Sequence, residues 1–80
     1  MKAYTLKKKE KTEEYHLFEG DFTNTGCNSE NISICEKMNK QFSGGNVFTC
    51  FDENEARIRI AEIGRQVCGI CTSHLYTTNY

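Results

Sequence analysis

The sequence contains no proline, no tryptophan and no hydrophobic run long enough to cross a membrane. A membrane-spanning helix needs about 20 mostly apolar residues, so we expect neither a transmembrane segment nor a membrane partner. With 80 residues, the chain is also too short for a large catalytic fold. A chain of this size buries only about 60% of its unfolded surface, in one small core.

A strong charge of one sign is missing as well. The formal net charge is −1, so no global field steers the protein toward nucleic acid. The charge is nevertheless uneven. Residues 1–11 contain five lysines and one glutamate, a charge of +4, and the other 69 residues carry −5. The lysines of the segment Lys7–Lys11 could contact phosphate, but the block is short and is interrupted by Glu10. A solvated hairpin turn is the simpler interpretation.

Hydrophobic residues make up 38% of the chain, and five Phe and four Tyr are among them. This content is enough for a core and argues against wholesale disorder. We find no internal repeat and no linker. We therefore expect one domain spanning residues 1–80.

Alternating polar and apolar residues predict strands. The pattern occurs in residues 3–8 and again in residues 13–19, with polar residues between them, which predicts an antiparallel hairpin over 3–19. A short apolar run at 47–51 predicts a third strand.

Two helices are expected. Ile32, Cys35, Met38 and Phe42 fall at helical spacing, which predicts a helix from about Ser29 to Phe42. The second helix starts at Asp52, whose spacing from Glu55 resembles a capping box, and it stops or bends near residues 65–69. Its apolar stripe consists of Ala56, Ile60, Ile63 and Val67, and Ile58 lies off the stripe, which suggests burial on two sides. The predicted fold class is a small α+β domain of order β-β-α-β-α, with both helices on one face of the sheet.

Five cysteines are many for a chain of this size. The first residues contain no apolar segment of signal-peptide length, so we expect a cytoplasmic protein with reduced thiols. Clustered cysteines in a reducing compartment indicate a metal more often than disulfides.

The strongest motif is Cys68-x-x-Cys71, since two thiolates at this spacing can bind one tetrahedral zinc ion. We predict that Cys27 and Cys35 complete a zinc site, with Cys50 and His74 as alternates. His16 is a further candidate ligand, although on a strand it is more typical of a packing residue. Two alternatives remain: five reduced thiols packed in a small core, or a redox pair at Cys68 and Cys71.

No catalytic constellation is evident, so the leading hypothesis is a non-enzymatic protein that covers a surface of another macromolecule. Stand-alone acidic domains of this size include phage-encoded inhibitors of the anti-CRISPR kind, and size and composition alone suggest this class. A nucleic-acid-binding zinc module and a thiol redox protein are the alternative functions. The nucleic-acid-binding module would use Lys7–Lys11 with Arg57, Arg59 and Arg65. The expected contacts with a protein partner are Glu53, Glu55, Glu62, Tyr76 and Tyr80.

Overall fold

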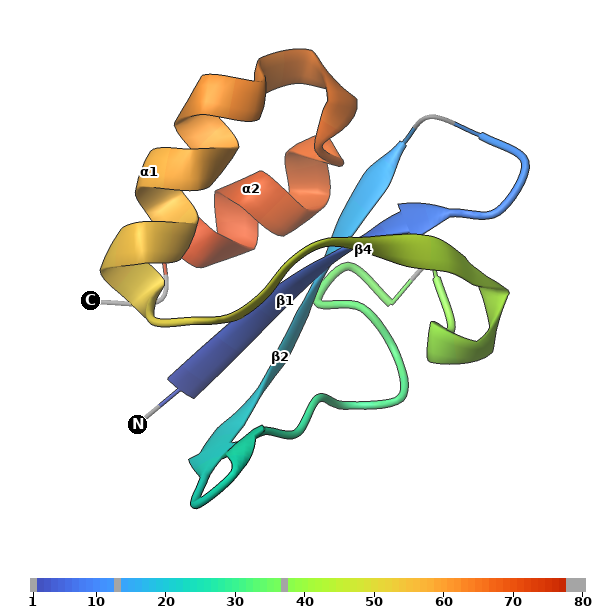
Figure 1. Cartoon of the computed structure of the whole chain (residues 1–80). Coiled ribbons are helices and arrows are strands. Elements are labelled where there is room, and N and C mark those ends of the chain that lie inside the picture. Colours follow the sequence, from blue (N-terminus) through green and yellow to red (C-terminus); the bar gives the residue numbers. More distant parts are fainter. Residues whose placement is uncertain (1, 13, 37, 78–80) are drawn as a thin grey trace.

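A curled antiparallel sheet of four strands, with two α-helices on one of its faces, makes up the fold (Figure 1). The computed structural model describes residues 2–12, 14–36 and 38–77. The elements, in chain order, are β1 (Lys2–Lys9), β2 (Tyr15–Thr23), β3 (Gly26–Cys27), β4 (Ser43–Phe51), α1 (Glu53–Ile63) and α2 (Gly69–Thr77), with 3₁₀ turns at Lys40–Phe42 and Gly64–Gln66.

The predicted hairpin is confirmed and forms the centre of the sheet. The strand order is β3-β2-β1-β4, so β1 lies between two antiparallel neighbours. In the hairpin register, Leu6 is opposite Leu17 and Thr5 is opposite Phe18. Residues 3–7 of β1 are all buried, which means that both faces of the central strand are covered.

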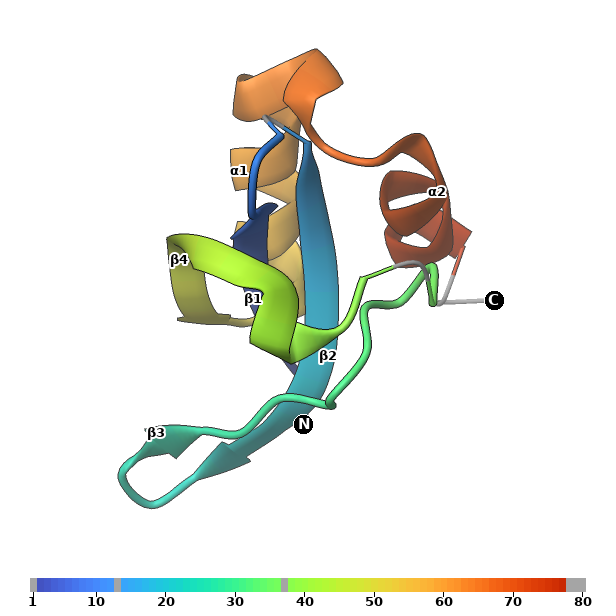
Figure 2. The same ribbon diagram turned by 90° about the vertical axis from the view of Figure 1, so that its right-hand side faces the viewer.

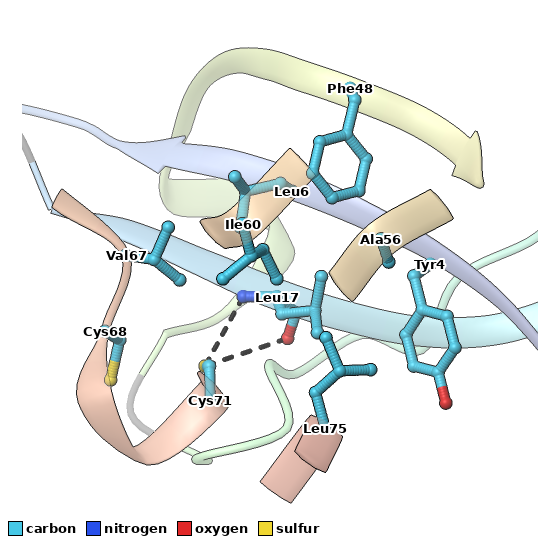
Figure 3. Packing of buried hydrophobic residues seen from close by; sticks show 10 residues of the cluster. All are labelled: Tyr4, Leu6, Leu17, Phe48, Ala56, Ile60, Val67, Cys68, Cys71 and Leu75. Carbon is cyan, nitrogen blue, oxygen red and sulfur yellow. Dashed lines mark hydrogen bonds between the residues drawn. The ribbon is translucent and has the colours of Figure 1, made fainter. Parts of the chain in front are cut away.

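The helix side of the sheet carries the main hydrophobic core (Figure 3). Leu6 and Leu17 pack there against the α1 stripe that the sequence predicted, in which Ala56 and Ile60 are buried. The remaining buried members of the core are Tyr4, Phe48, Val67, Cys68, Cys71 and Leu75. The expectation that α1 is buried on two sides is wrong, since Ile58 is 57% exposed.

The predicted capping box starts α1. The backbone N–H of Glu55 donates to Oδ1 of Asp52 at 2.8 Å, and the Glu55 carboxylate accepts from the Asp52 backbone N–H. The helix ends at Gly64, which has a φ of +78°, a backbone conformation that glycine adopts more easily than other residues. The helix was expected to stop or bend near residues 65–69, and its last residue is slightly earlier, at Ile63.

The helix predicted from Ser29 to Phe42 does not form in the described residues of that range, which make a loop along β2 and end in the 3₁₀ turn Lys40–Phe42 (Figure 2). The backbone N–H of Glu30 donates to the carbonyl of Glu19, and that of Ile34 donates to the carbonyl of Leu17, both at 2.8 Å. These bonds to β2 take the place of helical hydrogen bonds. Ser and Asn side chains favour a loop over a helix because they bond to nearby backbone groups. Ser33 does so, since its Oγ accepts a hydrogen bond from the Met38 N–H.

The segment 28–42 covers the second face of the sheet. Met38 is only 2% exposed, and Phe18 and His16 of β2 are fully buried. Gly20 permits the close approach of the chain, because a Cβ at this position would collide with the backbone carbonyl of Asn28. The α+β class, with a hairpin, a further long strand and two helices, is thus confirmed, but both helices follow β4. No helix of the described residues is long and apolar enough to cross a membrane.

Candidate metal centre

Four potential metal ligands meet at the outer edge of β2: His16, Cys35, Cys68 and Cys71. Their ligand atoms all lie within 4.8 Å of one another. The Nδ1 atom of His16 is 3.2 Å from the sulfur of Cys35 and 3.9 Å from that of Cys71. A tetrahedral ion of zinc's size separates such ligand atoms by about 3.5 to 3.8 Å. The group can therefore hold a metal ion with small shifts of its side chains.

The backbone of β2 brings these ligands together. On its outer edge, β3 pairs only with Phe22 and Thr23, which leaves the stretch around Tyr15 and Leu17 to other segments. The N–H of Cys68 donates to the carbonyl of Tyr15 at 2.7 Å. The N–H of Leu17 points at the sulfur of Cys71 at 3.4 Å (Figure 3). Loop 28–42 hydrogen-bonds to the same edge of β2. This places the sulfur of Cys35 beside the sulfurs of Cys68 and Cys71.

His16 is oriented by an acidic neighbour just before the start of β2. Its Nε2 lies 2.6 Å from a carboxylate oxygen of Glu14. An ionised carboxylate can only accept a hydrogen bond, so a neutral ring that donates to Glu14 through Nε2 leaves the lone pair of Nδ1 facing the thiols. Metal-binding histidines almost always have such a partner on the second ring nitrogen, because it fixes the ring and its tautomer.

The sulfur atoms also have polar neighbours. Besides the Leu17 N–H at Cys71, the hydroxyl of Ser33 lies 3.2 Å from the sulfur of Cys35. Hydrogen bonds of this kind stabilise thiolates at metal sites. Burial of the Cys71 side chain, which is fully inaccessible, raises the pKa of its thiol far above the usual range. A metal ion bound here would displace the thiol proton.

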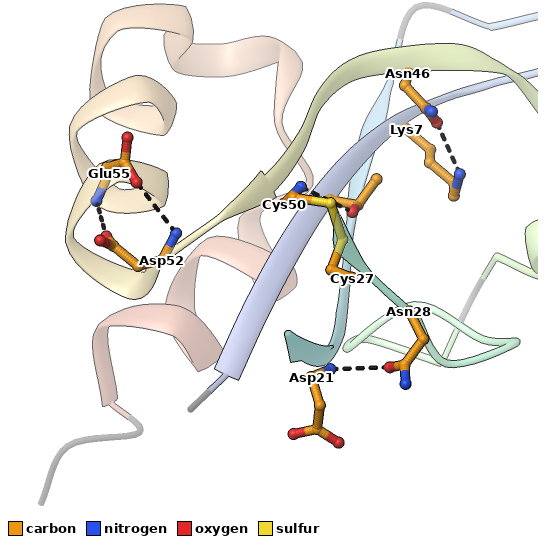
Figure 4. Close-up of a disulfide and its surroundings, with 9 residues drawn as sticks. Lys7, Asp21, Cys27, Asn28, Asn46, Cys50, Asp52 and Glu55 are labelled. Atoms are coloured by element: carbon orange, nitrogen blue, oxygen red, sulfur yellow. Dashed lines mark hydrogen bonds between the residues drawn. A yellow bond between two sulfur atoms is a disulfide. The ribbon is translucent and has the colours of Figure 1, made fainter. Parts of the chain in front are cut away.

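Cys27 is not part of this group, which corrects the predicted ligand set. Cys27 and Cys50 instead form a disulfide, 23 residues apart in sequence (Figure 4). The expectation that every thiol is reduced is therefore wrong for this pair, and Cys50 is not an alternate ligand. The bond joins β3 and β4, the two edge strands of the sheet, which requires the sheet to be curled. The spacing of the cysteines in the sequence could not predict that the edge strands β3 and β4 come together.

His16 takes the fourth place, and His74, the other predicted alternate, is exposed on α2 outside the group. The sequence analysis gave His16 a packing role because it lies on a strand. The signal that identifies it is Glu14 just before β2, since residues two apart in an extended chain point to the same side.

The acidic residues predicted to contact a partner have contacts within α1. Glu53 lies 3.6 Å from Arg57, Glu62 lies 3.5 Å from Arg59, and Glu55 belongs to the cap. The hydroxyl of Tyr76 donates to the carbonyl of Arg57 at 3.1 Å, and its ring lies under the guanidinium. Tyr80 lies outside the described residues. Contact with a partner remains a prediction for all of these residues.

The lysine block does not form one continuous surface. Lys7 is buried with 9% of its surface exposed, whereas Lys8 next to it is exposed. Arg57 is occupied by the carbonyl of Leu75, to which it donates at 3.0 Å. These placements weaken the expected phosphate-binding surface.

The His/Cys group thus concentrates metal-binding chemistry in the described part of the chain. It offers three sulfur donors and one imidazole nitrogen, a set that suits soft and borderline metal ions. Comparison of the chain with protein-family models found no match, and searches of curated proteins and of solved structures found no similar chain.

Proposed function

We propose that His16, Cys35, Cys68 and Cys71 bind a structural Zn²⁺ ion, in a non-enzymatic protein that acts by covering a surface of a protein partner. Four protein donors leave no open position for a substrate, as is typical of structural rather than catalytic zinc. The observation that carries the zinc assignment is the orientation of His16, whose Nε2 faces Glu14 while Nδ1 faces the thiols.

Zinc would fasten loop 28–42 to α2, because Cys35 belongs to the loop and Cys71 to the helix. Small domains need such cross-links, since their cores supply little stability. The same loop carries two exposed apolar side chains, Ile32 at 43% and Phe42 at 52%. We take these two residues, the loop patch, as the surface that meets the partner. Size and composition favour a phage-encoded inhibitor of the anti-CRISPR kind as the specific form of this function.

Elemental analysis of protein purified under mild reduction tests the metal. We expect about one Zn²⁺ per chain, as for a Cys₃His site, and its loss in Cys35→Ser and Cys68→Ser. The matched control is the double variant Cys27→Ser/Cys50→Ser, which removes two sulfurs outside the group and should keep its zinc. Metal-free protein, or equal loss of zinc in the control, contradicts the assignment.

Cross-linking in extracts of the native host, followed by affinity measurement with the purified partner, tests the surface. Ile32→Ser/Phe42→Ser should weaken the complex, and Ile58→Ser, which removes an equally exposed apolar side chain from α1, should not. The alternative surface is α1 itself. If reversal of Glu53, Glu55 and Glu62 to Lys weakens the complex while the loop variant leaves it intact, the partner meets α1 and the loop patch is wrong.

The alternative functions have less support. A nucleic-acid-binding zinc module would need a continuous basic surface, whereas Lys7 is buried and Arg57 donates to the carbonyl of Leu75. A redox thiol needs a lowered pKa, whereas burial raises the pKa of Cys71. A cytoplasmic location belongs to the proposal because three reduced thiols at a metal site suit a reducing compartment, although the disulfide suits an oxidising one.

A further inference from the structure

A polar hollow of about 230 Å³ lies on the loop side of the sheet, away from the core that faces the helices. Two lysines, Lys7 of β1 and Lys40 of the loop, contribute to its wall. The other polar groups come from β1, from β4 and from the chain after β3: Thr5, Asn46, Thr49, Asn28 and Ser29. Asn28 and Ser29 directly follow Cys27, so the disulfide to Cys50 fixes this wall (Figure 4).

Lys7 is a buried cation without an acidic partner. Its side chain reaches Asn46, to whose Oδ1 the ammonium donates at 2.7 Å, and it lies 5.8 Å from the centre of the Phe18 ring. No carboxylate of the described residues lies within ion-pair distance of it. A buried charge is costly unless it is paired, and a neutral amide compensates only part of that cost.

Lys40 adds a second positive charge to the same hollow. Burial and the neighbouring charge of Lys40 both lower the pKa of Lys7. The described lining contains no acid, but it does contain hydroxyl and amide groups that can donate hydrogen bonds. Two cations and several neutral donors around one small space are complementary to an anion with several acceptor oxygens.

We propose that this hollow binds a phosphate group, either inorganic phosphate or the phosphate of a small monoester, between Lys7 and Lys40. Lysine is a common phosphate ligand and acts there as a point charge. The amide of Asn46 would position the Lys7 ammonium for the anion. This ligand site is separate from the metal centre and does not depend on the proposed zinc.

Titration of the isotopically labelled full chain with inorganic phosphate, followed by NMR, tests the site. Saturable shifts of the backbone amides of Asn46 and Thr49 are expected. Lys7→Met should weaken binding about tenfold or more, as expected when one charge-assisted hydrogen bond is lost. The matched control is Lys8→Met, which removes the same charge from the exposed neighbouring position and should leave the affinity unchanged. Lys40→Met, a change on the surface that spares the core, should weaken binding in the same way as Lys7→Met.

Parallel titrations identify the source of the phosphate. Tighter binding of a nucleoside monophosphate than of inorganic phosphate indicates an ester as ligand, and equal affinity indicates the free anion. Acetate, which has fewer acceptor oxygens and a lower charge, should bind more weakly than either. Shifts that do not saturate, or a loss in Lys8→Met as large as in Lys7→Met, overturn the site in favour of general attraction to surface lysines.

Discussion

The Nε2 atom of His16 lies 2.6 Å from a carboxylate oxygen of Glu14, while Nδ1 on the other side of the ring lies 3.2 Å from the sulfur of Cys35. The imidazole is thus fixed between an acid at the surface and a half-buried thiol. A histidine that only filled space in the core would need neither neighbour. The arrangement explains why the histidine that the sequence placed among packing residues belongs with the cysteines.

Removing the charge of Glu14 should weaken metal binding without unfolding the protein, because the carboxylate is 53% exposed and only orients His16. Glu14→Gln is expected to lower zinc affinity by about tenfold or more, the usual effect of losing such a partner. Competition with a chromophoric chelator measures the affinity. Glu10→Gln, at an exposed site in the same hairpin, is the control, and equal affinities for both variants would show that Glu14 has no role.

Removing the metal should release loop 28–42 before it affects the sheet. Cys35 connects the loop to Cys71 of α2, whereas β1 is hydrogen-bonded along both edges, to β2 and β4. After chelation, we expect faster hydrogen exchange at the amides of Ile34 and Met38 and little change in β1. Uniformly faster exchange would mean that the metal supports the whole fold, and unchanged exchange would mean that it does not fasten the loop.

The disulfide should contribute to stability because it closes a long loop. For a separation of 23 residues, the chain-entropy estimate is about 3 kcal/mol. Cys27→Ser/Cys50→Ser should lower the free energy of unfolding in urea by roughly this amount. The zinc content of the variant serves as its control for native structure. An unchanged free energy with normal zinc content would show that the bond does not constrain the chain.

Lys7 should decrease the stability of the ligand-free protein. Because burial lowers the pKa of Lys7, the native state binds its proton less tightly than the unfolded state does. The cost is fully present at neutral pH and disappears as the pH rises through the lowered pKa. Lys7→Met should therefore raise the urea midpoint at pH 7, and its advantage should shrink toward about pH 10. Lys8→Met should leave the urea midpoint unchanged at both pH values. A urea midpoint that falls in Lys7→Met would mean that the ammonium stabilises the fold.

Local patterns predicted the parts of the fold that local forces determine. The alternation in residues 3–19 gave the hairpin, and the spacing of Asp52 and Glu55 gave the start of α1. The loop 28–42 could not be predicted in this way. Its residues have helical spacing, but hydrogen bonds from Glu30 and Ile34 to β2, which are distant in sequence, decide its conformation.

The metal centre was predictable only in part, because some of its ligands are close in sequence and others are not. Cys68 and Cys71 are close in sequence, and Cys35 was named as a ligand, although as part of a helix that does not form. Cys27 was misassigned because only the curl of the sheet brings it to Cys50. His16 joins the group because β2 has an edge that no strand covers at that point, and no spacing in the sequence reveals it.

Loop 28–42 starts beside the disulfide at Cys27 and is joined at Cys35 to the metal-binding group. These two attachments require opposite conditions. Strong reductants cut the first, and oxidants convert the thiols of the second into forms that no longer ligate. With zinc bound as proposed, the loop is fastened at both points only over an intermediate range of redox potential.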